Sequence, residues 1–238
     1  MKAVILAGGK GTRGKPYTEY FPKAMTPING KPLIDYVVRY LKSFNFIKEI
    51  IIISDYDGLG GQIKNYYGNQ KNIKFVQDSQ SGTGGDLLHI EKELKNESEF
   101  LLWFVDNLCA IDVKKMRDTF KEKNSFACIA TRTKRKEETG FATVKEGIIT
   151  EFKEKPIMKL QLSECLGIYM LGKEIIQKIK KKKQKQVNLS FDILQQLSKE
   201  GKISAHDIGD REWIDAESPM ILERNEKIVT KIIKQMGL

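Results

Sequence analysis

The chain has 238 residues and a formal net charge of +10, with 40% hydrophobic and 30% charged residues. This composition can form the core of one globular domain, and no apolar run reaches the length of a transmembrane helix. We therefore expect a cytoplasmic protein with no signal peptide and no membrane partner. The three cysteines are far apart and form no C-x-x-C pair, which argues against a disulfide framework or a structural zinc site.

The positive charge comes mostly from lysines that are spread along the chain. Their densest run covers residues 178–186, which we interpret as a solvated helix end and the loop that follows it. No aromatic residue lies within this run, so it does not indicate a platform on which single-stranded bases stack. Net charge alone is weak evidence for nucleic-acid binding, and we expect no nucleic-acid partner.

The first half of the chain alternates short apolar runs with amphipathic segments. In chain order, the predicted elements are a strand at 2–7, a helix at 32–44, a strand at 49–54, a helix at 61–68, a strand at 72–78, a helix at 83–94 and a strand at 99–107. This alternation predicts an α/β protein, with a Rossmann-like, mostly parallel sheet flanked by helices.

The pattern changes after residue 110, where the segments no longer alternate regularly. The predicted elements are a helix at 113–123, a strand at 125–131, an antiparallel hairpin at 140–156, a strand at 163–171, a helix at 190–202, a strand at 203–208 and a terminal helix at 217–235. Because no linker interrupts the chain, we expect one domain over 1–238. Its halves are about 1–110 and 111–238, with a small antiparallel extension in the second.

The glycine-rich stretch AVILAGGKGTRGKP, residues 3–16, follows the first predicted strand and fits three phosphate-loop patterns. A dinucleotide fingerprint must pass directly into a helix, but Pro16 and Pro22 make a regular helix at 14–22 unfavourable. A G-x-x-x-x-G-K-[ST] loop needs a hydroxyl after its lysine, and position 16 is proline. These two readings are therefore disfavoured.

The remaining pattern is G-G-x-G-T-R, in which backbone N–H groups can approach a triphosphate closely. Arg13 offers a bidentate fork to phosphate oxygens. Lys23 lies on a turn between Pro22 and Pro27, from which we expect it to face the loop. The set suits the β and γ phosphates of an NTP. A plain glycine turn with surface charges is the alternative.

LAGGKGTR, followed by FPKAMTPINGKPLIDY, closely resembles the N-terminal signature of the sugar-1-phosphate nucleotidylyltransferases, the NDP-sugar pyrophosphorylases. The resemblance implies the nucleotide-diphospho-sugar transferase fold, an NTP-binding half over about 1–110 and a sugar-phosphate half over about 111–238. The implied reaction joins an NTP and a sugar 1-phosphate into an NDP-sugar and pyrophosphate, with Mg²⁺ as cofactor. The resemblance also places the end of the chain near the end of the catalytic domain, without the β-helix of some relatives.

Segments that match the family in order imply the site residues. These segments are QDSQSGTGG, WFVDN, GFATV, EFKEKP, CLGIYML and EWIDAESP. The implied contacts are Leu6, Ala7, Gly8, Gly9, Gly11, Thr12, Gln77, Gly82 and Thr83 for the nucleotide; Arg13 and Lys23 for the leaving pyrophosphate; Asp106 and Asp215 for the metal; and Gly140, Glu154, Lys155 and Gly167 for the sugar phosphate, with Lys155 on its phosphate.

Each of these assignments has a structural alternative. Asp106 could cap a helix, Asp215 could pair with a surface lysine, and Lys155 could be one of many solvated lysines. Four positions depart from the family pattern: Gly14 replaces leucine, Ala24 replaces proline, Cys165 replaces asparagine, and Glu217 belongs to DAES instead of D-x-G-T. The last two leave the sugar pocket undefined.

The base and the sugar stay open. Uridylyl or thymidylyl transfer to glucose 1-phosphate and guanylyl transfer to mannose 1-phosphate both match parts of the chain. The sequence is compatible with a homo-oligomer. Two alternative functions remain, namely a catalytically silent regulatory subunit that binds an NDP-sugar, and a cytidylyltransferase for a phospho-alcohol.

Overall fold

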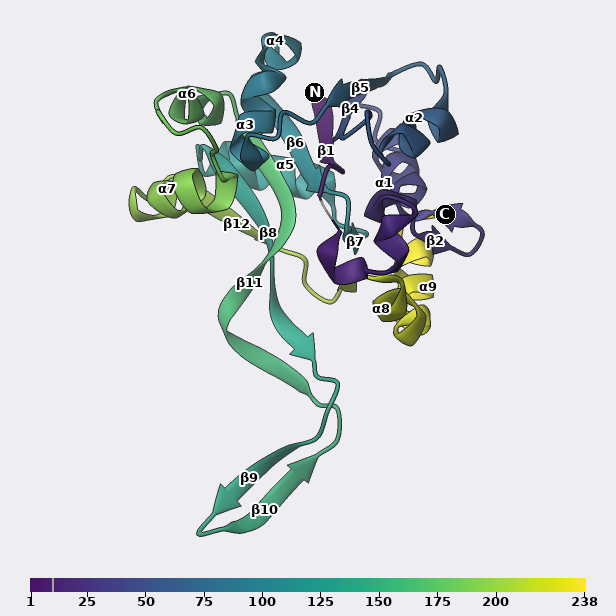
Figure 1. The fold of residues 1–238 in the computed structure, drawn as a ribbon. Coiled ribbons are helices and arrows are strands. Elements are labelled where there is room, and N and C mark those ends of the chain that lie inside the picture. The colour runs from purple at the N-terminus through teal and green to yellow at the C-terminus, as the bar shows by residue number, and fades with distance from the viewer. Residues whose placement is uncertain (10) are drawn as a thin grey trace.

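Figure 1 shows the computed structural model of the chain, which describes residues 1–9 and 11–238. The strands of the main sheet are β1 (Lys2–Leu6), β4 (Glu49–Ser54), β5 (Ile73–Gln77), β6 (Glu99–Phe104), β8 (Ala127–Lys136), β11 (Ile157–Gly172) and β12 (Ile203–Asp207). Within the described residues they form one sheet in the order β12-β8-β11-β6-β1-β4-β5. All neighbours are parallel except β11, which runs antiparallel to β6 and β8. The predicted α/β class is confirmed.

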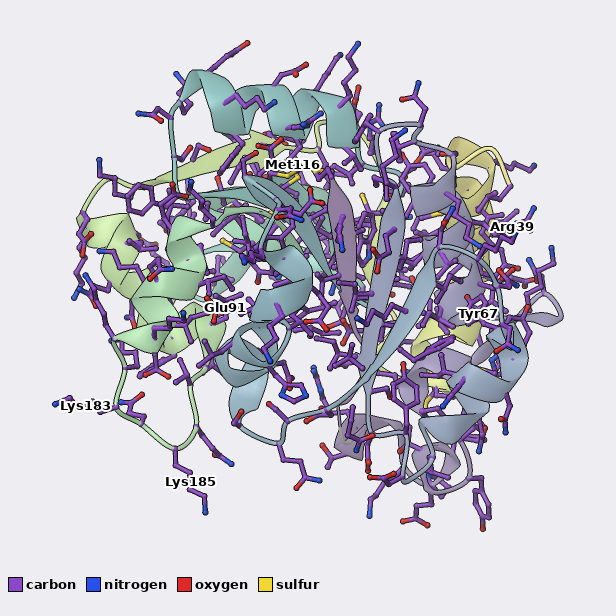
Figure 2. The ribbon with its side chains drawn as sticks, turned by 90° about the horizontal axis from the view of Figure 1, so that it is seen from above. Arg39, Tyr67, Glu91, Met116, Lys183 and Lys185 are labelled. Atoms are coloured by element: carbon purple, nitrogen blue, oxygen red, sulfur yellow. The ribbon has the colours of Figure 1, made fainter. Side chains whose placement is uncertain are left out.

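The central strands are buried on both faces because helices cover the sheet on each side. One face is covered by α1 (Leu33–Lys42), α2 (Gly61–Tyr67), α5 (Val113–Glu122), α8 (Pro219–Arg224) and α9 (Glu226–Gln235). The other is covered by α3 (Gly82–His89), α4 (Glu91–Leu94), α6 (Glu174–Lys180), a π-helical turn (Leu189–Leu194) and α7 (Gln195–Lys199). Figure 2 shows Met116 and Glu91 on opposite sides of the sheet. Two apolar cores result, and alternate residues of each strand point into each.

Two predicted elements differ from the structure at the carboxyl side of the sheet. The predicted strand at 99–107 ends at Phe104, and β7 (Asn107–Cys109) pairs antiparallel with β13 (Trp213–Asp215). The predicted helix at 217–235 is divided at Asn225, whose backbone (φ −109°, ψ 26°) separates α8 from α9. The first interruption lies in the segment that carries Asp106. The second lies in the helix that follows the segment carrying Asp215.

The predicted hairpin is present as β9 (Phe141–Lys145) and β10 (Ile148–Lys153). Its turn uses Glu146 and Gly147, which both have positive φ. The hairpin is carried by the outer ends of β8 and β11 and projects away from the body of the protein (Figure 1). We call residues 134–159 the arm.

The lysine run behaves as predicted. Helix α6 ends at Lys180, and Lys183 and Lys185 lie on the loop that follows and point away from the body (Figure 2). In the part of the chain that the structure describes, no helix combines the length and the apolar character needed to cross a membrane.

Candidate active site

The glycine-rich loop begins where β1 ends, at the carboxyl edge of the parallel strands. The Ala7 amide donates to the Ile53 carbonyl at 2.8 Å, and the Ser54 hydroxyl donates to the Ala7 carbonyl at 3.1 Å. A Cβ atom on Gly8 would lie 1.9 Å from a carboxylate oxygen of Asp78, so a side chain at this position would have to displace that carboxylate. The loop is therefore fixed against β4 and β5. Lys10 lies outside the described residues.

The next turn of the loop closes around Thr18. Its hydroxyl donates to the Gly11 carbonyl at 2.7 Å, and Gly11 has a left-handed backbone with φ 61°. A Cβ atom on Gly14 would lie 2.7 Å from the Thr18 methyl carbon. The departure from the family at Gly14 thus has a packing reason, since Thr18 fills the space that a side chain at position 14 would need.

Two short 3-10 turns, η1 (Thr12–Gly14) and η3 (Lys23–Met25), present Arg13 and Lys23. Arg13 forms an ion pair with Glu217. The Lys23 ammonium lies 2.6 Å from an oxygen of Asp106 and 3.9 Å from Oδ1 of Asp215. Lys23 therefore faces the loop and the carboxylates, as its position between two prolines predicts.

Asp106 and Asp215 come from distant parts of the chain and meet through β7 and β13. Asp215 pairs with Asn107 in the ladder, and the Ala216 amide donates to the Asp106 carbonyl at 2.7 Å. Oδ1 of Asp215 is buried and has no hydrogen-bond partner among the described residues. Burial, followed by the nearby charge of Asp106, raises the pKa of Asp215 to about 6.

Behind the carboxylates, Asn107 connects three elements. Its Oδ1 accepts a hydrogen bond from the Trp213 indole at 3.0 Å and from the Gly167 amide at 3.2 Å. A Cβ atom on Gly167 would lie 2.4 Å from Nδ2 of Asn107, so glycine is needed for this close approach. The Arg132 guanidinium stacks on Trp213 at 4.4 Å and donates to Glu164 at 2.7 Å.

Two cavities lie beside this carboxylate pair. The first, about 320 Å³, is enclosed by the glycine-rich loop and the end of β6; its lining includes Leu6, Ala7, Gly9, Gly11, Thr12, Arg13, Lys23, Thr83, Asp106 and Glu217. The second, about 810 Å³, lies between β8, β13, α8, α9 and the base of the arm. Asp215, Trp213 and Arg132 line it. The pair therefore has room for a ligand on each side.

The predicted base-binding segment lies at the end of β5 and the start of α3. The side-chain amide of Gln77 makes two hydrogen bonds. Its oxygen accepts from the backbone N–H of Tyr56 at 2.8 Å, and its nitrogen donates to the Asp55 carboxylate at 2.9 Å. Gly82 has φ 82°, and a Cβ atom there would lie 2.6 Å from the carbonyl oxygen of Val187. The segment is thus closely packed at the edge of the first cavity.

Thr83 connects this segment to the cavity itself. Its hydroxyl accepts a hydrogen bond from the Leu189 amide at 2.9 Å, and the residue lines the first cavity. Of the three predicted contacts in QDSQSGTGG, Thr83 alone is among the residues that line this cavity.

Three predicted sugar contacts are not brought to the carboxylates. Gly140, Glu154 and Lys155 lie on the arm, and Figure 1 shows the arm leaving the body far from the glycine-rich loop. Gly167 alone of the predicted sugar contacts lies beside the site, through its bond to Asn107.

Sequence reasoning missed several groups that the structure places at the site. Glu217 appears in the sequence only as a departure from the family pattern, yet it pairs with Arg13. Trp213 received no role from the sequence, but it is partly exposed and lines the second cavity. Arg132 carries no motif, so only its contact with Trp213 identifies it.

The nucleotidyl transferase family model matches residues 2–227 of the chain. D-glycero-alpha-D-manno-heptose 1-phosphate guanylyltransferase of Campylobacter jejuni is 34% identical over 181 residues, which cover 74% of this chain and 77% of that protein. The bifunctional protein GlmU of Methanocaldococcus jannaschii is 30% identical over 237 residues, which cover 98% of this chain and 55% of that protein. The chain thus spans little more than half the length of the archaeal relative.

Solved structures share the fold. A putative glucose-1-phosphate thymidylyltransferase from Bacillus anthracis superposes with a TM-score of 0.76 at 23% identity, covering 96% of this chain and 95% of that chain. HddC from Yersinia pseudotuberculosis superposes with a TM-score of 0.70, also at 23% identity, covering 97% of this chain and 98% of that chain. The chain belongs to the nucleotidyl transferase family, and the resemblance to sugar-1-phosphate nucleotidylyltransferases is confirmed.

Proposed function

We propose that this nucleotidyl transferase family member transfers a nucleotidyl group from an NTP to a sugar 1-phosphate and releases pyrophosphate, with Mg²⁺ as cofactor, in the cytoplasm. The observation that carries the proposal is the convergence of Arg13, Lys23, Asp106 and Asp215 beside a closely packed glycine loop. The reaction joins two polyanions, so its main requirements are positioning and charge neutralisation. The site supplies groups for both.

The NTP binds in the first cavity, with its triphosphate along the glycine-rich loop. Backbone N–H groups at Gly9, Gly11 and Thr12 can approach phosphate oxygens closely because glycines carry no side chain there. Arg13 and Lys23 hold the β and γ phosphates, which leave as pyrophosphate. In exchange, each cation gives up its present carboxylate partner, Glu217 or Asp106.

Asp106 and Asp215 fit a magnesium ion. Oδ1 of Asp215 is a buried acceptor without a hydrogen-bond partner in the described part of the chain, and the Lys23 ammonium lies 3.9 Å from it. Mg²⁺ typically takes one or two carboxylates and completes its shell with water and substrate phosphates, so a third protein ligand is not required. When bound, the ion would offset phosphate charge.

The sugar 1-phosphate binds in the second cavity, which shares Asp215 with the metal site. Its phosphate oxygen attacks the α-phosphorus, and pyrophosphate leaves in line with the new bond. No residue of the chain becomes covalently modified. Trp213 lines this cavity next to the carboxylates, and Gly167 lies behind it through the shared hydrogen bonds to Asn107. We also propose that Lys155 holds the sugar phosphate and that Glu154 accepts hydrogen bonds from the sugar when the arm, on which both residues lie, approaches this cavity.

The base is read by the segment at the end of β5 and the start of α3, with Gln77, Gly82 and Thr83. Guanylyl, uridylyl and cytidylyl transfer all occur among the names of the relatives, so the names do not select a base. We retain UTP or dTTP with glucose 1-phosphate and GTP with mannose 1-phosphate as donor and acceptor pairs.

Pyrophosphate release tests the proposal. The assay crosses ATP, GTP, CTP, UTP and dTTP with glucose, mannose, N-acetylglucosamine and manno-heptose 1-phosphates and with phosphocholine, in Mg²⁺ and in EDTA. We expect turnover with one pair of NTP and sugar 1-phosphate, and only when Mg²⁺ is present. Turnover with CTP and phosphocholine alone would indicate the phospho-alcohol reaction. Silence with every pair, with an NDP-sugar still bound, would indicate a regulatory subunit and refute the proposal.

A further inference from the structure

Arg132, on β8, lies in the wall of the second cavity and is held there by two contacts. Its Nε donates to an oxygen of Glu164 at 2.7 Å, and its guanidinium lies over the Trp213 ring, 4.4 Å from the ring centroid. The Arg132 side chain is only 16% exposed, and it lines the cavity together with Trp213 and Asp215. The guanidinium is therefore positioned before a ligand binds.

These contacts leave most of the guanidinium donors available. A guanidinium is planar and carries five N–H groups. Stacking on Trp213 uses its face and Glu164 accepts from Nε, whereas neither Nη1 nor Nη2 has a hydrogen-bond partner among the described residues. Glu164 is not one of the described residues that line the cavity, so it holds Arg132 from behind. A fixed arginine fork of this kind matches the oxygens of a phosphate group.

The charge of the cavity also favours an anion. Among the described residues, its lining contains seven lysines and arginines and five aspartates and glutamates, so the lining is net positive. Lys134 and Lys159 are directly opposite each other in the pairing of β8 with β11, and both line the cavity. Like charges in such a pair repel each other, and Asp210, 3.5 Å from Lys134, is itself 95% exposed. A negatively charged ligand therefore suits this cavity better than a neutral one.

The same wall connects Arg132 to the two carboxylates. Trp213 and Asp215 are two residues apart on β13, so they lie on one face of the strand, about 7 Å apart along it. Asn107 accepts a hydrogen bond from the Trp213 indole and donates from Nδ2 to Asp106 at 2.7 Å. A phosphate bound to Arg132 would thus lie beside the carboxylate pair, where the proposed reaction needs its attacking oxygen.

We propose that Arg132 binds the phosphate of the sugar 1-phosphate through its terminal N–H groups, with Glu164 and Trp213 as its positioning residues. This inference rests on the proposed function. Arg132 precedes the arm, whereas Lys155 lies on it. The acceptor phosphate therefore has a ligand in the cavity wall whatever position the arm takes.

Steady-state kinetics of Arg132→Met tests the inference, with the NTP and the sugar 1-phosphate that the wild type turns over. Methionine keeps an unbranched side chain beside Trp213 but has no N–H donors. The KM for the sugar 1-phosphate should rise at least about tenfold, because charge-assisted hydrogen bonds to phosphate are among the stronger ones. The KM for the NTP should change less than about twofold, because the NTP binds in the first cavity.

Arg135→Met is the matched control. Arg135 lies on the same strand and lines the same cavity, but its side chain is 45% exposed and both its Nε and its Nη2 donate to Glu137. Its replacement should change the KM for the sugar 1-phosphate less than about threefold. An equal rise in both variants would reveal a general effect of charge and overturn the assignment to Arg132.

A purely structural role for Arg132 predicts different results. If Arg132 only supports Trp213, Arg132→Met should unfold at a lower urea concentration and either leave the KM for the sugar 1-phosphate unchanged or raise both KM values together. Either result overturns the inference.

Two further measurements keep the test decisive. Should Arg132→Met fail to fold, Arg132→Lys replaces it, because lysine keeps the charge without the fork; an unchanged KM for the sugar 1-phosphate would then overturn the inference. Inhibition by the free sugar, which has no phosphate, should be the same in wild type and variant. Equal weakening of this inhibition would place Arg132 on the sugar ring and refute the phosphate contact.

The outcomes also separate this inference from the proposed function. An active wild type whose KM for the sugar 1-phosphate does not respond to Arg132 overturns the inference alone. A wild-type chain without transferase activity overturns the proposed function, and the inference with it.

Discussion

Asp215 offers a test of the site that does not require the substrates. Its pKa is raised from about 3.8 to about 6 by burial and by the charge of Asp106. The ionised form is therefore disfavoured in the folded protein relative to the unfolded chain. Each factor of ten in proton affinity is worth about 1.4 kcal/mol, so full ionisation costs up to about 3 kcal/mol in a dry site. Because the Asp215 side chain is 36% exposed, solvent screening reduces the cost of ionisation to about 1–2 kcal/mol.

Asp215→Asn should therefore stabilise the metal-free protein while abolishing transfer. Because the pKa of Asp215 is higher in the folded protein than in the unfolded chain, the free-energy cost of ionising this carboxyl is absent below about pH 4. The cost develops as the pH rises through 6. In EDTA at pH 8, the variant should gain about 1–2 kcal/mol in free energy of unfolding by urea denaturation, and little at pH 4. Adding Mg²⁺ should raise the stability of the wild type and leave that of the variant unchanged.

Asp210→Asn serves as the matched control. Asp210 lies on the same segment, and its side chain is 95% exposed, beside Lys134. Its replacement should change the unfolding free energy by less than about 0.5 kcal/mol at either pH. Two results would refute the reasoning about the buried carboxylate. One is an Asp215→Asn variant that is less stable than the wild type at pH 8, and the other is a variant that is stabilised equally at both pH values.

Three further predictions concern the loop and the carboxylates. Asp106→Asn should abolish pyrophosphate release without changing the far-UV circular dichroism spectrum; normal turnover would contradict the metal assignment. Gly14→Ala should destabilise the fold by about 1–3 kcal/mol in urea denaturation because its Cβ would lie 2.7 Å from the Thr18 methyl, and Thr18→Ser, which removes that methyl, should restore most of the loss. Gly167→Ala should displace Asn107 and reduce kcat/KM at least tenfold, measured by pyrophosphate release; an unchanged value would show that Asn107 tolerates the shift.

The sequence predicts the alternating half of the fold well, because buried parallel strands read as continuous apolar runs. β1, β4 and β6 are such runs, and the loop after β1 could be assigned from its glycines and from Pro16. The short strands β7 and β13 could not be predicted. Each has three residues, and their pairing depends on Asn107 and Asp215 meeting across more than 100 residues of chain.

The nucleotide side of the site was more predictable than the acceptor side for a physical reason. Arg13, Lys23 and Asp106 all lie within a few residues of buried strands or proline turns, so local geometry positions them. Glu154 and Lys155 depend on the direction taken by a long hairpin. That direction is decided by the β8–β11 ladder, which no local pattern encodes.

The charges of the site explain why it can stay folded before its ligands bind. Lys23 is held between Asp106 and Asp215, and Arg13 pairs with Glu217, so each cation has a carboxylate close by. The Lys23 side chain is only 12% exposed, so leaving its ammonium without a partner would be costly. When the NTP enters, phosphate oxygens replace these carboxylates as partners of Arg13 and Lys23. The two aspartates then lose their own cation, which increases the demand for a divalent ion at the moment when the phosphates can help to bind it.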